Sequence, residues 1–308
     1  MGFQERDVIS VLQKIFATTD SRLKVGIGDD AAIVSTQPQS VITSDMAVED
    51  VHFRLDWSSA YQIGRKVAAA NLADIFAMGG KPKYLTVAMA ATGKEELEWM
   101  LDVARGIAHE AHIAGAQVIG GDLSKSKKIV ISITATGEFA EDKKPILRSG
   151  AQAGDSVFIS NLPGWSAAGL IALQREFHGE LIDFAIAEHC APSVDYDNAE
   201  QIAIGANALC DISDSLLIQA EQIAEASRTC LEIDGDLITK HPEFAELLQV
   251  AKTLDVSVFD LILSGGEDHC FLATGHSLKG YEIGKVVAGS GVRLLHVETP
   301  QPGWQHFL

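Results

Sequence analysis

Strand-like and helix-like segments alternate along the first half of the chain, and this alternation limits the possible folds more than any other feature. Residues 31–35 (AAIVS) and 40–48 (SVITSDMAV) have the character of strands. The alanine-rich segment 59–78 predicts a long helix, with Ser58 or Ser59 placed to cap it. Segments typical of a strand, of a helix and of two further strands follow, at 83–91, 93–115, 116–122 and 127–139. Helices and strands mixed in this way predict a layered α/β architecture with mixed sheets.

A domain boundary is expected in the polar, glycine-containing stretch 140–155, after which a new strand opens at Ser156. The second half repeats the mixture of elements. Helices are expected at 165–174, 180–190, 198–209 and 215–227, and strands at 229–233, 269–274, 281–287 and 292–297. Because 308 residues suffice for two domains of ordinary size, the sequence predicts an N-terminal domain, 1–148, and a C-terminal domain, 149–308.

Charge and apolar content exclude several classes of function. The formal net charge of −18 argues against a nucleic-acid partner, because phosphates call for stripes of Lys and Arg. No apolar run approaches the roughly 20 residues that span a bilayer. The opening residues, as far as Phe16, predict an amphipathic helix instead of a signal peptide. The four cysteines are widely spaced and form no C-x-x-C pair, which predicts buried free thiols in a cytoplasmic protein.

A short Gly/Ser-rich segment that contains aspartate recurs at the connections between elements. The six instances are 26–31 (GIGDDA), 43–53 (TSDMAVEDVHF), 71–80 (NLADIFAMGG), 119–124 (IGGDLS), 211–216 (DISDSL) and 264–269 (SGGEDH). Each alone is ordinary chemistry, since Asp beside Gly favours turns and Asp or Ser caps helices. Six carboxylates that converged, however, would repel one another without a counter-charge. Oxygen-only ligands favour Mg²⁺, which proteins hold through one or two carboxylates, water and substrate phosphates.

Three other kinds of site fit the sequence less well. No G-x-x-x-x-G-K-[ST] segment occurs, so a P-loop is excluded. GIGDDA imitates a dinucleotide-binding turn, but a strand-like segment follows where a helix is required, and Asp29 and Asp30 would lie where the pyrophosphate binds. The HEAH segment at 109–112 lacks the spacing of a zinc-protease helix and predicts a helix surface.

In order and approximate spacing these segments, together with 147–155 (LRSGAQAGD), resemble the thiamine-monophosphate kinase family, which belongs to the aminoimidazole ribonucleotide synthetase-like ATP-binding superfamily. The resemblance runs from about residue 26 to the C-terminal GWQHF. It implies Mg²⁺-assisted, in-line transfer of the γ-phosphoryl group of ATP to thiamine monophosphate, giving thiamine diphosphate. It also implies two α/β domains. The first binds ATP and Mg²⁺ and pairs in a homodimer, and the second completes the active site.

The resemblance also implies roles for individual residues, carried over position by position. Residues matched to metal ligands are Asp30, Thr43, Ser44, Asp45, Asp74, Asp122, Asp211 and Asp214. Residues matched to nucleotide contacts are Gly121, Asp122, Arg148 and Ser213, and those matched to thiamine phosphate contacts are His52, Glu267 and Trp304. The candidate catalytic residues among the acids are Asp30, Asp45, Asp74, Asp122 and Asp214. The residues alone fit a structural interpretation equally well. In that interpretation Arg148 is a surface arginine, Trp304 is a packing residue, and His52 is a histidine whose hydrogen bonds are made locally.

Three departures from the family pattern affect the expected shape of the pockets. Ser215 replaces the glycine of DISDGL, His269 and Cys270 replace the last two residues of GGEDYE, and Leu123 replaces the threonine usual after GGD. Two rival functions stay open. One is an aminoimidazole ribonucleotide synthetase-like enzyme, which shares the ATP and metal chemistry. The other is a non-catalytic acidic protein that binds nucleotides or divalent cations.

Overall fold

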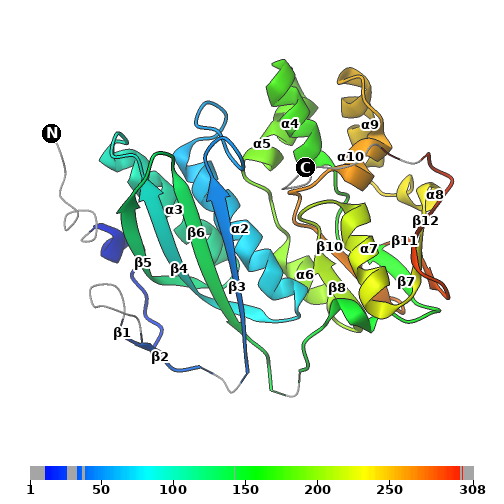
Figure 1. Ribbon diagram of the computed structural model, residues 1–308, viewed down its shortest axis with the longest axis horizontal. Coiled ribbons are helices and arrows are strands. Elements are labelled where there is room, and N and C mark those ends of the chain that lie inside the picture. The colour runs from blue at the N-terminus through cyan, green and yellow to red at the C-terminus, as the bar shows by residue number, and fades with distance from the viewer. Residues whose placement is uncertain (1–10, 26–32, 37–38, 142, 299, 301–308) are drawn as a thin grey trace. The chain divides into compact units, whose positions relative to one another are not determined.

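Residues 11–25, 33–36, 39–141, 143–298 and 300 are described by a computed structural model of the chain (Figure 1). The chain forms two units, one made of Met1–Ile75 and Gly80–Lys143 and the other of Phe76–Gly79 and Lys144–Leu308. Each unit has its own mixed sheet, so the predicted α/β class is confirmed. Within the described ranges, no helix has the length and apolar character needed to cross a membrane.

The first unit contains a four-stranded sheet with the strand order β3-β6-β4-β5. Its strands are β3 (Ser40–Val48), β4 (Lys81–Ala91), β5 (Gln117–Lys125) and β6 (Val130–Glu138). β6 pairs antiparallel with β3 and with β4, whereas β4 and β5 are parallel. β3 and β5 are therefore the two edges of this sheet. A separate pair of short strands, β1 (Leu23–Val25) and β2 (Ile33–Val34), precedes it along the chain.

Helices α2 (Ala60–Ala77) and α3 (Leu97–Ile113) pack against one face of the first sheet (Figure 1). Ser59 caps α2, because its hydroxyl accepts the backbone N–H of Gln62 while the Gln62 side chain accepts the backbone N–H of Ser59. The predicted cap is thus confirmed at Ser59. The reciprocal pair fixes where the chain enters the helix that carries Asp74.

The two helices approach each other closely at glycines. A Cβ atom on Gly64 or on Gly106 would lie 2.1 Å from a backbone carbonyl oxygen of the other helix. Close by, buried Glu110 forms an ion pair with Arg65 at 2.8 Å. The HEAH segment at 109–112 is therefore only partly the helix surface that was expected: its two histidines are exposed, but its glutamate is not.

The two faces of the first sheet carry different side chains. Ile131, Ile133 and Ala135 of β6 alternate along the strand and are fully buried on the helix-covered face. The opposite face is open in the described part of this unit (Figure 1). There Ile42 and Met46 of β3 are 67% and 56% exposed. One face of the sheet therefore belongs to the core, and the other presents apolar side chains to the surroundings.

The second unit contains a six-stranded sheet with the order β12-β9-β11-β7-β10-β8. Neighbouring strands are antiparallel, except that β9 and β12 are parallel. The strands are β7 (Ser156–Ile159), β8 (Ala206–Asp211), β9 (Cys230–Asp234), β10 (Phe271–Gly275), β11 (Tyr281–Val287) and β12 (Gly291–Leu295). The strand expected at Ser156 is confirmed as β7.

Helices pack against this second sheet and against one another, and they share a buried core with it. They are η1 (Arg148–Gly150), α4 (Trp165–Arg175), α5 (Glu180–Cys190), α6 (Tyr196–Ile202), α7 (Leu216–Ser227), α8 (Gly235–Ile238), α9 (Phe244–Thr253) and α10 (Val258–Ser264). The core includes Ile159 and Ile233 from the sheet and Ile262 from α10, all of them fully buried. All four cysteines are free and buried, as expected.

One sequence expectation for the second unit is wrong, and one region was not predicted. A helix was expected over 198–209, but α6 ends at Ile202 and β8 begins at Ala206. Gly205, with a φ of 83°, separates the two elements in a conformation that does not continue a helix. The sequence also gave no expectation for α8, α9 and α10. The helix expected at the start of the chain falls largely outside the described residues.

Candidate active site

Thr43 and Asp74 of the first unit form the centre of an oxygen-rich group. The hydroxyl of Thr43 donates a hydrogen bond of 2.6 Å to Oδ2 of Asp74. Thr43 lies in β3 and Asp74 in α2, so this bond joins the edge of the sheet to the helix that covers it. Asp45 follows Thr43 by two residues and therefore lies on the same face of β3. Three of the predicted metal ligands are thus brought to one side of the sheet.

Asn71 anchors this group. Its side chain is fully buried. Its Oδ1 accepts the backbone N–H of Asp45 at 2.9 Å, while its Nδ2 donates to the carbonyl oxygen of Val67 at 2.9 Å. An edge strand leaves alternate backbone amides without a strand partner, and Asn71 satisfies one of them. The sequence signal for this arrangement is the NLAD segment. Asn71 and Asp74 are three residues apart in it and therefore lie on one side of α2.

Ser44 and Asp122 lie on the other face of the first sheet. Ser44 alternates with Thr43 along β3, and its hydroxyl donates to a carbonyl oxygen of β6 at 3.1 Å. The pairing register places exposed Asp122 of β5 in the same row as Met46, on the open face. Because β3 and β5 are opposite edges, Asp122 is separated from β3 by three strand spacings, about 14 Å. One copy of the first unit therefore does not bring Asp122 to Asp74.

Gly121 and His52 each have a local structural role. A Cβ atom on Gly121 would lie 2.0 Å from the carbonyl oxygen of Val87, so only glycine lets β5 run this closely along β4. His52 lies in the turn after β3, where its Nδ1 accepts the backbone N–H of Val48 at 3.1 Å. Nδ1 is therefore the unprotonated nitrogen of the neutral ring. The expected contacts of both residues with nucleotide and thiamine phosphate stay predictions.

In the second unit, the segments DISDSL and SGGEDH lie against each other. β8 and β10 are paired strands, and the two segments continue from them. The backbone N–H of Glu267 donates to the carbonyl oxygen of Ser213 at 2.6 Å, and that of His269 donates to Ile212 at 3.0 Å. Glu267 and His269 both have positive φ, 63° and 52°. Two acidic segments far apart in the sequence thus form one structure.

The predicted acids of this second group differ in their surroundings. Asp211, the last residue of β8, is 3% exposed, and its Oδ2 accepts a hydrogen bond from Nδ1 of His269 at 3.2 Å. Asp214 is half-buried, and the described residues offer its carboxylate no hydrogen-bond donor. Between them, Oγ of Ser213 accepts a bond of 3.2 Å from Nε2 of Gln219 in α7. Asp214 is therefore the acid with the most coordination capacity left.

Ser215 and Asp268 stabilise the two segments. Ser215, one of the departures from the family pattern, begins α7, and its hydroxyl accepts the backbone N–H of Ile218 at 3.2 Å. Asp268 accepts the backbone N–H groups of Gly164 and Ser166 at the start of α4, both at 2.9 Å. Burial raises the pKa of Asp268 to about 6 against these two bonds. Asp268 lies in the SGGEDH segment but was not among the predicted site residues.

Arg148 lies next to the segment that carries Asp211. Its carbonyl oxygen accepts the hydroxyl of Ser227 at 2.7 Å, which ties η1 to the end of α7. Burial raises the pKa of the Cys210 thiol, and the neighbouring Arg148 guanidinium opposes that rise. Cys210 precedes Asp211 in β8, so this exposed arginine lies beside the strand that leads into the second acidic group. Two further predicted residues, Asp30 and Trp304, lie outside the described residues.

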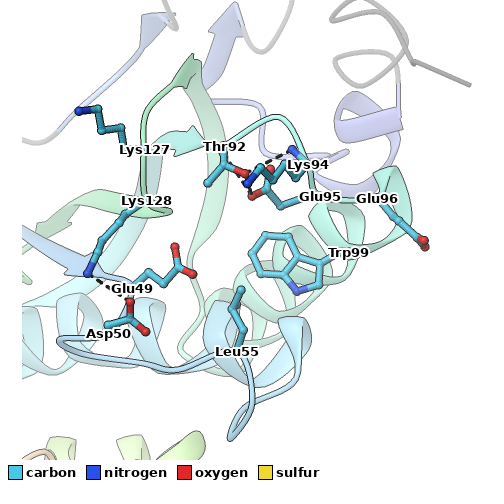
Figure 2. A pocket seen from close by; sticks show the side chains of 10 residues that line it. All are labelled: Glu49, Asp50, Leu55, Thr92, Lys94, Glu95, Glu96, Trp99, Lys127 and Lys128. Carbon is cyan, nitrogen blue, oxygen red and sulfur yellow. Dashed lines mark hydrogen bonds and ion pairs between the residues drawn. The ribbon is translucent and has the colours of Figure 1, made fainter.

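The first unit also contains a cavity of about 560 Å³ that none of the predicted residues lines (Figure 2). Figure 2 shows Leu55 and Trp99 near one another among charged side chains. Three of its acids are already engaged, and one of them, Glu49, accepts the backbone N–H of Ile129 at 2.9 Å. Glu95 accepts bonds from Thr92 and Gly93, and Asp50 forms an ion pair of 3.2 Å with Lys128. The cavity is thus distinct from the two acidic groups.

A third cluster, Asp234, Asp236 and His296, is explained by local structure. Oδ1 of Asp234 lies 2.8 Å from Nδ1 of His296 and accepts the backbone N–H of Asp236 at the start of α8. The three potential ligand atoms lie within 4.8 Å of one another, but the side chains of Asp236 and His296 are largely exposed.

The donor atoms of the predicted residues fit a hard divalent cation. Thr43, Asp45 and Asp74 in the first unit, and Asp211 and Asp214 in the second, offer hydroxyl and carboxylate oxygens. Oxygen ligands of this kind suit Mg²⁺, whereas the soft sulfur ligands that favour zinc are absent from these two groups. The four buried cysteines lie within the core, and burial raises the pKa of the Cys210 and Cys270 thiols. Each group therefore has donor atoms of the kind that suits a hard divalent cation.

Comparison with known proteins gives consistent matches. The family model described as "AIR synthase related protein, N-terminal domain" matches residues 28–139. Thiamine-monophosphate kinase of Mycobacterium tuberculosis is 36% identical over 292 residues, which cover 92% of this chain and 86% of the relative. The curated relatives therefore match nearly the whole chain.

Solved structures agree with this result. The crystal structure of thiamine-monophosphate kinase from Stenotrophomonas maltophilia superposes with a TM-score of 0.82 at 26% identity, covering 96% of this chain and 97% of that one. The structure of AaThiL complexed with AMPPCP and TMP gives a TM-score of 0.81 at 30% identity, covering 98% and 97%. The similarity thus extends over both units of the chain.

Proposed function

The chain belongs to the thiamine-monophosphate kinase family, and from that membership we propose that it transfers the γ-phosphoryl group of ATP to thiamine monophosphate, giving thiamine diphosphate. The observation that carries the proposal is the group formed by Thr43, Asp74 and Asp45. It lies on the sheet of the unit that the family model matches, and a buried asparagine holds it in place. A relative complexed with AMPPCP and TMP supports the same pair of substrates.

The chemistry needs positioning and charge neutralisation more than it needs a general base. The acceptor is itself a phosphate, whose second pKa near 6 leaves an ionised oxygen at neutral pH. That oxygen attacks the γ-phosphorus, and the bond to the leaving β-phosphate oxygen breaks in line. We assign Asp45, Asp74, Asp211 and Asp214 to holding Mg²⁺, which neutralises phosphate charge when bound. Arg148 is assigned to a direct contact with a nucleotide phosphate.

The remaining roles follow the family pattern. We assign Asp30, Thr43, Ser44 and Asp122 to metal binding, Gly121 and Ser213 to the nucleotide, and His52, Glu267 and Trp304 to thiamine phosphate. Carboxylate and aromatic neighbours suit the cationic thiazolium ring of thiamine. The buried free cysteines support a cytoplasmic protein.

A homodimer would bring Asp122 into the site of the other subunit. Ser44 and Asp122 share the open face of the first sheet but lie at opposite edges. A second copy that placed its β5 edge beside β3 would bring Asp122 of the partner subunit to Ser44. If the open faces of the two sheets also turned toward each other, the contact would cover Ile42 and Met46, the two large apolar side chains on that face.

The direct test is chromatographic detection of thiamine diphosphate formed from ATP and thiamine monophosphate in the presence of Mg²⁺. Formylglycinamidine ribonucleotide, tested in parallel, should yield no product. Asp74→Asn and Asp122→Asn should each lower kcat by about 100-fold or more with the fold intact. Asp102→Asn, which alters an exposed carboxylate on α3, is the matched control and should retain activity. Full activity in both Asp74→Asn and Asp122→Asn would refute the metal assignment.

Mixing two inactive variants tests the homodimer. If Asp122 acts in the partner's site, a heterodimer of Asp45→Asn and Asp122→Asn chains contains one site with both aspartates intact. Activity should therefore return when the two proteins are unfolded and refolded together. If both aspartates act within one chain, neither site is intact and activity stays absent.

A further inference from the structure

We propose that His269 is a positioning residue, which holds the carboxylate of Asp211 in the orientation that binds a divalent cation. The inference rests on the function proposed above and adds to it a residue that contacts neither metal nor substrate. It follows from the geometry of one buried pair in the second unit.

The pair is almost completely removed from solvent. The side chains of His269 and Asp211 are 7% and 4% exposed, and Nδ1 of His269 lies 3.2 Å from Oδ2 of Asp211. A carboxylate only accepts hydrogen bonds, so the proton of this bond must be on Nδ1. A buried carboxylate whose oxygens lack donors is costly, and the bond removes that cost for one oxygen. The other oxygen, Oδ1, keeps its lone pairs for a cation.

Backbone hydrogen bonds fix the position of His269 in the chain. His269 precedes β10, and its N–H donates to Ile212 at 3.0 Å, while the N–H of Ile212 donates to Cys270 at 2.7 Å. These two bonds extend the pairing of β8 with β10 beyond Asp211. The φ of His269 is 52°, a conformation that few residues other than Gly, Asn, Asp and His adopt readily. The chain thus holds a histidine in an unusual conformation directly beside a predicted metal ligand.

Residues behind a metal ligand commonly orient it, and their loss lowers metal affinity by about 10- to 100-fold. Without His269, the Asp211 carboxylate could rotate about its χ2 angle. Neither oxygen would then have a hydrogen-bond donor to hold it in place when it exchanges water for a cation. The expected consequence is weaker cation binding with little change in the fold. His269 would therefore affect the metal dependence of the enzyme more than its stability.

The test compares substitutions that keep or remove the donor at the position of Nδ1. In His269→Asn, the side-chain amide places an N–H near that position, and Asn tolerates positive φ. His269→Gln moves the amide to the position of Nε2, and His269→Ser shortens the side chain so that it cannot reach. Binding of Mn²⁺ in the presence of ADP is followed by electron paramagnetic resonance on the full-length proteins. Far-UV circular dichroism reports the fold.

We expect His269→Asn to bind Mn²⁺ within a few-fold of the wild type, and His269→Gln and His269→Ser to bind it about 10-fold or more weakly. The Mg²⁺ concentration needed for half-maximal activity should rise in the same order. Asp211→Asn distinguishes a failure of the positioning role from a failure of the metal assignment. If it weakens Mn²⁺ binding while His269→Gln and His269→Ser do not, the positioning role is refuted and the proposed function stands. If Asp211→Asn also binds Mn²⁺ like the wild type, the assignment of Asp211 fails, and the role of His269 fails with it.

Discussion

His241 allows a prediction of stability whose size follows from its surroundings. The residue is 5% exposed, and its ring centroid lies 3.9 Å from that of Tyr281. Its Nδ1 accepts the backbone N–H of Glu243 at 3.2 Å, so the neutral ring carries its proton on Nε2, for which the described residues provide no acceptor. A second proton, on Nδ1, would face the N–H of Glu243. Burial accordingly lowers the pKa of His241 from 6.5 to about 4.

This lowered pKa makes the folded state less stable in acid. In the unfolded chain His241 takes up its proton near pH 6.5, whereas in the folded protein it does so only near pH 4. Between these values the unfolded state binds more protons, so the free energy of unfolding falls as the pH is lowered. The difference between the pKa values of His241 in the two states corresponds to about 3 kcal/mol in the free energy of unfolding. The loss is complete near pH 4, and it is negligible well above pH 6.5.

Urea unfolding between about pH 7 and about pH 4 measures this contribution against two variants that do not titrate. His241→Asn keeps an oxygen that can accept the N–H of Glu243, and His241→Phe keeps the shape of the ring. Carboxylates such as Asp268 titrate in all three proteins and cancel in the difference. The wild type should lose about 3 kcal/mol relative to each variant as the pH falls. A difference that stays constant over this range in both variants would show that the protonation of His241 does not contribute to the loss of stability.

Two further predictions concern packing and capping. Gly64→Ala should lower the free energy of unfolding by about 1–3 kcal/mol despite the better helix propensity of alanine, because its Cβ would lie 2.1 Å from the carbonyl oxygen of Val103; urea unfolding that shows a gain in stability would contradict the close helix crossing. Ser215→Ala should cost about 0.5–2 kcal/mol by removing the cap of α7, whereas Ser215→Gly, which restores the family residue, should cost only a few tenths. Equal losses for the two variants, measured in the same way, would show that the hydroxyl does not act as the cap.

Local patterns predicted the regular elements well where the signal was long. Strand β3 begins and ends where the segment SVITSDMAV does, and α2 begins directly after the serine that caps it. The signal failed where elements are short. α8 has 4 residues and α10 has 7, too few for a helical period to be recognised, whereas α9 has 10 and was missed despite its length. The change from α6 to β8 depends on Gly205 and on pairing with β10, and only the pairing distinguishes a buried strand from a buried helix.

The kinds of site residue were predictable, but their arrangement was only partly so. The spacing of Asn71 and Asp74 places both on one side of α2, as the structure shows. The separation of Asp122 from β3 was not predictable, because the order of strands in a sheet is set by long-range pairing that no local pattern records. The roles of Asp268 and His269 depend in the same way on segments that meet only in the folded chain.

The nine residues of strand β3 serve two different faces of the sheet. Thr43 and Asp45 occupy one parity of the strand, and Ile42, Ser44 and Met46 occupy the other. Inserting or deleting a single residue among them would exchange the two sets, turning the acid outward and the apolar side chains toward the helices. We therefore expect homologous chains to differ in amino-acid type within this strand but not in its length. Alignment gaps should lie on either side of the strand and not inside it.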